Sequence, residues 1–253
     1  MPFVVKYGGN AMTEPAIRRA VAGVIREWAQ AGEEPVVVHG GGPFIKAELD
    51  RRGVSSSFVR GLRVTTEAVL EAAEAALTLL GKDLAQEIGD AVALTGRDSA
   101  TLLATVKDPE LGRVGSMVGV NEHLLRTLLS ARFTPVIACL AVDGDGHALN
   151  VNADEVAGYV AGALTSPVLF MTDVPGVLDN PANPASLLAT LDDTEVRQRI
   201  SDGRIAGGMI PKVEAALAAL DAGASWARIT DGRDVEAIRA SRTGGAGTLI
   251  KRA

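Results

Sequence analysis

Two glycine-rich turns, each beside a basic or polar side chain, are the clearest chemical feature of this 253-residue sequence. Lys6-Tyr7-Gly8-Gly9 follows one short apolar run, and His39-Gly40-Gly41-Gly42 follows another. Glycines let backbone N–H groups surround an anion, and a helix N-terminus after the turn adds a favourable dipole. Consecutive glycines cost backbone entropy, so the second turn favours close approach of a ligand. For the first turn, a tight connection with a solvated lysine is the simpler alternative, and His39 is interpreted as a packed neighbour rather than a catalyst.

Two further segments carry groups that could bind a small acid. Arg63 lies in Gly61-Leu62-Arg63-Val64-Thr65, and a guanidinium can hold a carboxylate through two parallel hydrogen bonds. In Asn150-Val151-Asn152-Ala153-Asp154, alternation places both asparagines on one side of an extended piece, and Asp154 begins the next helix. An exposed arginine and a helix-capping turn are the alternatives.

A second lysine stands where helix electrostatics disfavours it. Gly207-Gly208-Met209-Ile210-Pro211-Lys212 feeds a predicted helix, and the positive end of the macrodipole lies at its start. A lysine at this position suggests that it binds an anionic ligand. Lys6 and Lys212 could converge on a transferring group, with Asp154 holding both lysines without acting as a base. This is the logic of phosphoryl transfer, in which catalysis is positioning plus charge neutralisation.

The elements that must position these groups alternate in type along the chain. Apolar runs predict strands, and stripes at helical spacing predict helices. This order predicts parallel strands with right-handed crossovers, whose ligands bind at the carboxyl ends of the strands. Residues 107–120 are expected to form a β-hairpin region. The predicted strands are 3–5, 35–38, 91–94, 102–106, 134–140, 168–171, 226–229 and 248–250; the predicted helices are 17–28, 44–52, 66–88, one after Asn121, 154–164, 194–202, 211–222 and a short one before the last strand.

Composition and missing motifs exclude several function classes. The formal net charge is −6, which argues against a bulk basic surface for nucleic acid. The single cysteine, Cys139, cannot form an internal disulfide and suits a reducing compartment. No apolar run is long enough to span a membrane, and no signal peptide is evident, so we expect a cytoplasmic protein. The Walker A, dinucleotide-binding, G-x-S-x-G and H-E-x-x-H patterns are absent, which argues against a dinucleotide oxidoreductase, a serine hydrolase and a zinc enzyme.

Taken together, these segments resemble the N-acetylglutamate kinases of the amino-acid kinase family. The matches occur in family order from Lys6 to Lys212, and the Asn-Val-Asn-Ala-Asp and Gly-Gly-Met-x-Pro-Lys segments are the most specific. The resemblance implies an α/β fold, a three-layer αβα sandwich around a mostly parallel eight-stranded sheet. It implies a single domain, 1–253, with an acyl-acceptor lobe at about 1–147 and a nucleotide lobe at about 148–253.

The same resemblance implies phosphorylation of the γ-carboxylate of N-acetyl-L-glutamate by ATP, in arginine biosynthesis, with Mg²⁺ carried by ATP. Lys6 and Lys212 would stabilise the transition state, and Asp154 would organise them. The expected substrate contacts are the amides of Gly41 and Gly42, Arg63 at the α-carboxylate, and Asn150 at the acetylamino end. The expected nucleotide contacts are Gly8, Gly9, Asp173, Val174, Pro175, Gly176, Val177, Leu178, Arg204, Ile205 and Ala206.

The chain departs from the family pattern in two places. Gly81-Lys82 stands where many members carry Asn-Lys. The first predicted strand begins at about residue 3, which leaves no residues for the additional N-terminal helix that links dimers of arginine-inhibited relatives into hexamers. We therefore predict a homodimer without that mode of feedback.

Two alternatives remain open from the sequence. A kinase for carrier-protein-linked aminoadipate or glutamate would share the fold, but such relatives lack the intact Gly-Leu-Arg-Val-Thr segment. A non-catalytic amino-acid-binding regulatory domain would be expected to have lost Lys6, Lys212 or Asp154, and all three are present. A carboxylate acceptor is already ionised at neutral pH, so the absence of an obvious general base agrees with kinase chemistry.

Overall fold

A central sheet of eight strands organises the computed structural model, which describes residues 1–180 and 182–253. Neighbouring strands are parallel except for the antiparallel pair of β13 and β14. The mostly parallel eight-stranded sheet expected from the sequence is therefore confirmed. In spatial order the strands are β12 (Thr190–Asp192), β14 (Thr248–Lys251), β13 (Ala227–Asp231), β11 (Val168–Thr172), β1 (Pro2–Tyr7), β2 (Glu34–His39), β8 (Thr134–Ala138) and β5 (Ala91–Leu94).

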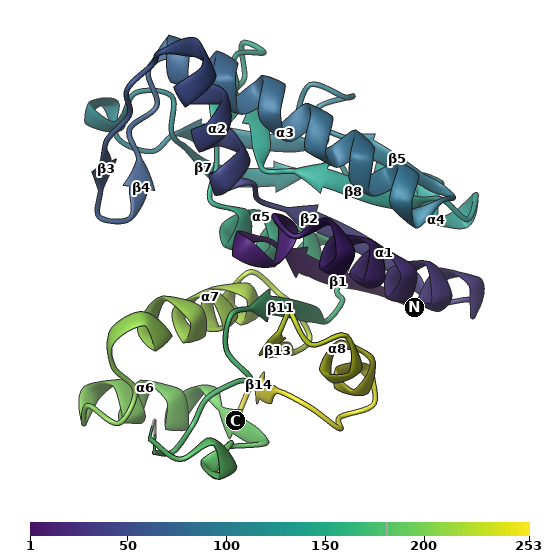
Figure 1. Ribbon diagram of the computed structural model, residues 1–253, viewed down its shortest axis with the longest axis vertical. Helices are drawn as coiled ribbons and strands as arrows, with labels where there is room; N and C mark the ends of the chain where they lie inside the picture. The colour runs from purple at the N-terminus through teal and green to yellow at the C-terminus, as the bar shows by residue number, and fades with distance from the viewer. Residues whose placement is uncertain (181) are drawn as a thin grey trace.

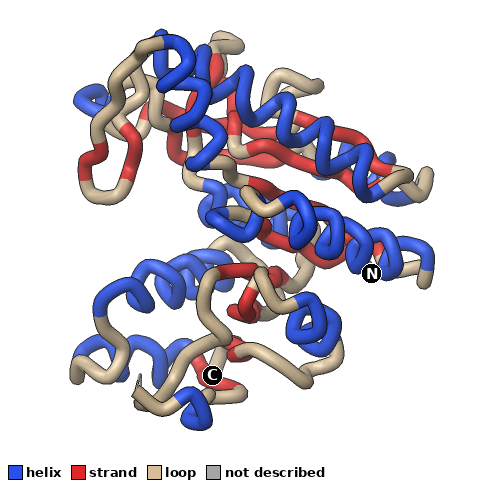
Figure 2. The backbone as a smooth tube through the Cα atoms, viewed as in Figure 1, coloured by secondary structure: helices blue, strands red, loops and turns tan. Residues whose placement is uncertain are grey.

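Helices cover both faces of this sheet and complete the three layers (Figure 1, Figure 2). On one face, buried side chains of β1 and β2 pack with α1 (Pro15–Gln30), the second half of α3 (Glu67–Ile88) and α8 (Val235–Arg242). On the other face they pack with α4 (Glu122–Ser130), α5 (Ala153–Ala163) and α7 (Ile210–Asp221). In the described part of the chain, the remaining helices are α2 (Gly42–Arg52), α6 (Asp193–Ser201) and four 3₁₀ segments, Gly9–Met12, Pro109–Leu111, Pro184–Ser186 and Gly207–Met209.

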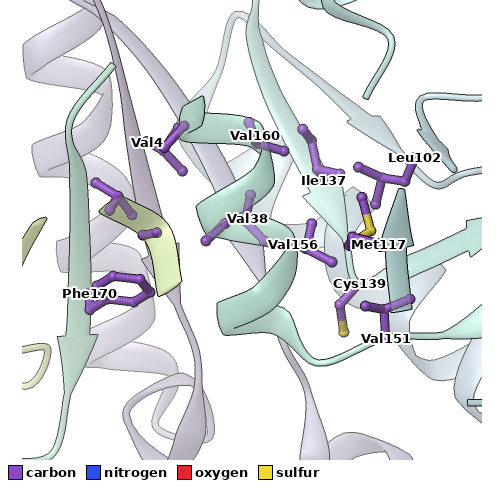
Figure 3. Packing of buried hydrophobic residues seen from close by; sticks show 14 of the residues in the cluster. Val4, Val38, Leu102, Met117, Ile137, Cys139, Val151, Val156, Val160 and Phe170 are labelled. Atoms are coloured by element: carbon purple, nitrogen blue, oxygen red, sulfur yellow. The ribbon is translucent and has the colours of Figure 1, made fainter. Parts of the chain in front are cut away.

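Alternation along β1 assigns its side chains to the two faces. Phe3 and Val5 are buried in the cluster that contains α1, and Val4 is buried in the cluster that contains α5. Figure 3 shows Val160 of α5 lying between Val4 and Ile137, with Val156 further along the same helix. Lys6 follows the same alternation and therefore points toward the α5 face.

A second, smaller sheet was not foreseen. It contains β10 (Ala148–Asn150), β9 (Leu140–Val142), β6 (Leu102–Val106) and β7 (Gly115–Val120), in that order. β6 and β7 form an antiparallel hairpin, so only the second strand lies in the expected hairpin region of 107–120, and residues 107–114 form the connection. The single strand expected over 134–140 is wrong: it breaks at Cys139, because the chain leaves the main sheet there and β9 pairs with β10.

The carboxyl ends of β1, β2, β8, β11 and β13 meet at one edge of the main sheet. A two-stranded hairpin of β3 (Phe58–Val59) and β4 (Leu62–Arg63) projects at the left of the upper part of Figure 1. None of the described helices is long and apolar enough to cross a membrane.

Candidate active site

Lys6 is held at the centre of the molecule by the first turn of α5. Asn152 caps this helix, since its Oδ1 accepts hydrogen bonds from the amides of Asp154 and Glu155. Asp154 thus lies at a helix N-terminus, where the macrodipole stabilises a carboxylate. The Lys6 Nζ lies 2.9 Å from Asp154 Oδ1, and the two side chains are 15% and 35% exposed. Lys6 is therefore mostly shielded from water, and Asp154 remains partly exposed to the cleft.

Lys212 has a different partner from the one expected. Its Nζ lies 3.1 Å from Asp173 Oδ1 and 3.3 Å from the Gly208 carbonyl oxygen. This contact lowers the pKa of the Asp173 carboxyl below its ordinary value. In this structure Asp154 accordingly contacts Lys6 and not Lys212, because Lys212 is drawn to the carboxylate in the turn after β11.

Two pockets adjoin at Lys6. A cleft of about 430 Å³ is lined by residues from β1, β11, α7 and the turn after β13, including Asp173, Lys212 and Arg233. A second pocket of about 290 Å³ is lined by the 40–42 turn, the β3–β4 hairpin and the 150–154 segment. Both linings contain Lys6, Gly8, Gly9 and Asp154. Ligands in the two pockets would therefore meet at this lysine–aspartate pair.

The second pocket gathers every residue expected to bind the acceptor: Gly41, Gly42, Arg63 and Asn150. The Arg63 guanidinium stacks over the Phe58 ring at 4.6 Å, and its Nη1 donates to Ser56 Oγ at 2.6 Å. Asn150 Nδ2 donates to Thr65 Oγ1 at 3.2 Å. The pocket thus presents a cation, an amide and the start of α2, where the first amides have no partner within the helix.

The two glycines at the start of α2 differ in their surroundings. A Cβ added to Gly41 would lie 2.6 Å from Leu77 Cδ2 of α3, whereas one added to Gly42 would meet no atom within 4 Å. Gly41 is therefore required by helix packing, and Gly42 faces open space in the pocket.

Buried groups surround the 40–42 turn. His39 Nδ1 lies 3.0 Å from the Gly40 carbonyl oxygen, and its buried Nε2 has no hydrogen-bond partner among the described residues. Burial lowers the pKa of His39 to about 4, so the ring is neutral at physiological pH. The Nε2 packs against Gly81, where an added Cβ would lie 2.9 Å from it. The Gly81 departure from the family pattern therefore makes room for the imidazole.

Not every residue expected to bind nucleotide reaches the larger cleft. Gly8, Gly9 and Asp173 line it, whereas the described lining does not include 174–178 or 204–206. Val177 is buried and its amide donates to Thr248 Oγ1 at 2.8 Å, and Ile205 is buried as well. Arg204 pairs with Asp202 at 2.6 Å. The contact of these segments with nucleotide remains a prediction.

Arg233 was missed by the sequence reasoning. It lines the larger cleft, and its Nη2 donates to the Asp173 carbonyl oxygen at 2.8 Å. The sequence could have indicated Arg233, because the turn Asp231-Gly232-Arg233 follows a predicted strand, as the glycine turns after Lys6 and His39 do.

The carboxylates of the larger cleft suit a metal that arrives with phosphate. Mg²⁺ is usually held by substrate phosphates, water and one or two carboxylates. Asp154 and Asp173 both line the cleft, and each is already paired with a lysine. The residues therefore fit a Mg²⁺ ion carried by a nucleotide better than a dedicated protein metal site.

Comparisons with known proteins agree with this geometry. The model of the amino acid kinase family matches residues 1–231. The acetylglutamate kinase of Deinococcus radiodurans is 53% identical over 98% of this chain and 99% of its own length. That of Thermus thermophilus is 46% identical over 98% and 97%. Among solved structures, the Streptococcus mutans protein smu.665 superposes with a TM-score of 0.81 at 30% identity, covering 100% of this chain and 99% of its own.

Proposed function

This chain belongs to the amino acid kinase family, and from that premise we propose that it transfers the γ-phosphoryl group of ATP to the side-chain carboxylate of N-acetyl-L-glutamate. The products are ADP and N-acetylglutamyl 5-phosphate, and the reaction belongs to arginine biosynthesis. The observation that carries this proposal is the meeting of two pockets at Lys6 and Asp154. Support also comes from the acetylglutamate kinases that match almost the whole chain.

The smaller pocket suits an acetylated amino acid with two carboxylates. Arg63 would bind the α-carboxylate through parallel N–H groups, and Asn150 would bind the acetylamino end. The amide at Gly42 would contact the same molecule. This arrangement leaves the side-chain carboxylate directed toward Lys6, which both pockets share.

Neutralisation of charge is the main requirement of the transfer step. The attacking carboxylate is ionised at pH 7, so no general base is needed. Its approach to the γ-phosphate brings two anions together, and Lys6 and Lys212 supply positive charge in the cleft where they meet. The amides of the Gly8–Gly9 turn would bind phosphate oxygens. Mg²⁺ bound with ATP would neutralise further charge on the phosphates.

A homodimer and a cytoplasmic location are part of the same proposal. The dimer rests on the resemblance to the family, and the location rests on the single cysteine, which suits a reducing compartment. Sedimentation in solution tests the dimer, and a hexamer would contradict it.

An ADP-release assay tests the activity directly. The acceptors to compare are N-acetyl-L-glutamate, glutamate, aspartate and carrier-protein-linked α-aminoadipate. We expect ADP with N-acetyl-L-glutamate and little with the other three. Activity with the carrier-linked acceptor alone would move the assignment to a kinase of lysine or ornithine biosynthesis.

A further inference from the structure

The carboxyl ends of β11 and β13 carry a chain of charged contacts that leads to Lys212. The carboxylate of Asp231, the last residue of β13, accepts hydrogen bonds from Arg233 Nε at 2.9 Å and Nη2 at 2.8 Å. The same Nη2 donates to the Asp173 carbonyl oxygen at 2.8 Å. The Asp173 carboxylate in turn holds Lys212 Nζ at 3.1 Å. One residue therefore connects Arg233 to Lys212.

Gly232 holds the turn that carries Arg233 close to the end of β11. Its amide donates to the Thr172 carbonyl oxygen at 2.8 Å. A Cβ added to Gly232 would lie 2.9 Å from the Cβ of Met171, so only glycine allows this close approach of β11 and β13. Consecutive residues of one turn, 232 and 233, thus bond to consecutive carbonyls of the other, 172 and 173.

The Asp173–Lys212 pair needs this support. Asp173 is 70% exposed and Lys212 is 24% exposed. An ion pair with one partner in water is a weak constraint, because solvent and salt compete for both charges. A guanidinium clamped on Asp231 and bonded to the main chain of Asp173 restricts the backbone that carries the carboxylate.

We propose that Arg233 is a positioning residue for Lys212. It holds the turn after β11 so that Asp173 keeps the Lys212 ammonium on the wall of the cleft that Lys6 also lines. The inference rests on the proposed function, in which Lys212 stabilises the transition state. The residue acts through Asp173 and not by binding phosphate itself.

A double-mutant cycle tests this role. Arg233→Gln should lower kcat about tenfold and change the KM for ATP by less than about twofold, because it affects a group used in the transition state. In a Lys212→Ala background the same change should cost nothing further, since the two residues act as one unit. If the double variant instead loses a further tenfold in kcat and has a raised KM for ATP, Arg233 binds phosphate itself and the proposal is wrong. An unchanged kcat in Arg233→Gln alone would also overturn it.

Arg252→Gln is the matched control. Arg252 is another guanidinium of the C-terminal half, and it pairs with Asp193 and Asp221 away from the cleft lining. Its replacement should leave kcat unchanged. An equal loss in both variants would show a general effect on folding and would contradict the positioning role.

A second measurement does not depend on the acceptor. Carboxyl ¹³C NMR gives the pKa of Asp173, which the contact with Lys212 holds below its ordinary value. The Arg233 charge also lowers this pKa, so the variant to compare is Arg233→Lys, which keeps the charge but not the forked N–H groups. Its Asp173 pKa should rise toward the value in Lys212→Ala, and an unchanged pKa would overturn the proposal. If the pKa rises but N-acetyl-L-glutamate is not phosphorylated, the proposed function fails and the positioning role stands.

Discussion

Lys6 and Lys212 enter the same cleft from supports of different kinds. Lys6 stands on the central strand β1, is 15% exposed and pairs with a carboxylate in the first turn of α5. Lys212 stands at the start of α7 and pairs with Asp173, which is 70% exposed. Lys6, which both pockets share, is therefore held by the core. Lys212 is held by a more exposed contact, which phosphate oxygens of a bound nucleotide can replace.

Removal of either lysine is the strongest test of this difference. Lys6→Ala should lower kcat about 10³-fold and Lys212→Ala about 10²-fold, with smaller changes in KM, because both charges act in the transition state. Lys6→Ala costs more since it also leaves Asp154 unpaired. Steady-state kinetics measures both, with Lys46→Ala, an exposed lysine of α2, as the control. Unchanged turnover in both variants would rule out the assigned chemistry.

His39, beside the acceptor pocket, and the aspartates near the larger cleft should affect stability in different pH ranges. His39 has a pKa lowered from 6.5 to about 4 by burial, so between these values the unfolded chain binds a proton that the folded chain does not. Stability should therefore fall as the pH falls from 6.5 to 4, by up to about 3 kcal/mol. The carboxyls of Asp173 and Asp231 have lowered pKa values, so the stability they contribute is lost only at lower pH.

Urea denaturation at several pH values measures this dependence. His39→Asn places an amide donor near the position of Nδ1 and should flatten the slope between pH 6.5 and 4. Parallel slopes in the two proteins would show that His39 is not the group responsible.

Replacement of Asp154 should lower kcat more than replacement of Asp173, in the same order as their lysine partners. Asp154→Asn removes the less exposed charge, which orders Lys6, and kcat should fall about 10²-fold. Asp173→Asn removes an exposed partner of Lys212, and kcat should fall about tenfold. Kinetics at saturating substrate gives both values. A larger loss for Asp173→Asn would reverse the comparison.

In the acceptor pocket, substitution of Gly41 should affect helix packing, whereas substitution of Gly42 should affect acceptor binding. Gly41→Ala presses a methyl group on Leu77 of α3 and should lower the free energy of unfolding by about 2 kcal/mol. Gly42→Ala should leave stability nearly unchanged and raise the KM for the acceptor. If this KM does not change, the assigned contact at Gly42 is wrong.

Arg63→Lys should act on substrate binding and have the smallest effect on kcat. Lysine cannot make the parallel pair of hydrogen bonds, so the KM for N-acetyl-L-glutamate should rise about tenfold while kcat changes less. The stacking on Phe58 is weakened by the same substitution. A variant that loses kcat and keeps KM would place Arg63 at the reacting group instead.

The sequence predicted those parts of the site that depend on local pattern. Apolar runs followed by glycine-containing turns marked the ends of β1, β2 and β11, and Asp154 marked the start of α5 to within one residue, although the cap is Asn152. The chain also continues apolar through Cys139, so nothing local indicated the break between β8 and β9.

Pairings across the fold could not be predicted in the same way. Lys212 meets Asp173 because the start of α7 and the turn after β11 line the same cleft, and Arg233 reaches Asp173 because β11 and β13 are neighbours in the sheet. In the sequence, Asp231 and Arg233 are indistinguishable from a local ion pair on a solvated turn. Register between distant strands decides which carbonyl the guanidinium meets.

The position of β14 bears on when the enzyme first becomes competent during its synthesis. β12 lies at the outer edge of the sheet and pairs with β14, and Thr248 Oγ1 donates to the Leu188 carbonyl oxygen and accepts from the Val177 amide. Strands β1, β2, β5 and β8 can pair while the ribosome is still translating the second half. β12 must wait for residues 248–251 to emerge. We therefore expect the acceptor pocket to take shape during translation and the nucleotide side only at its end.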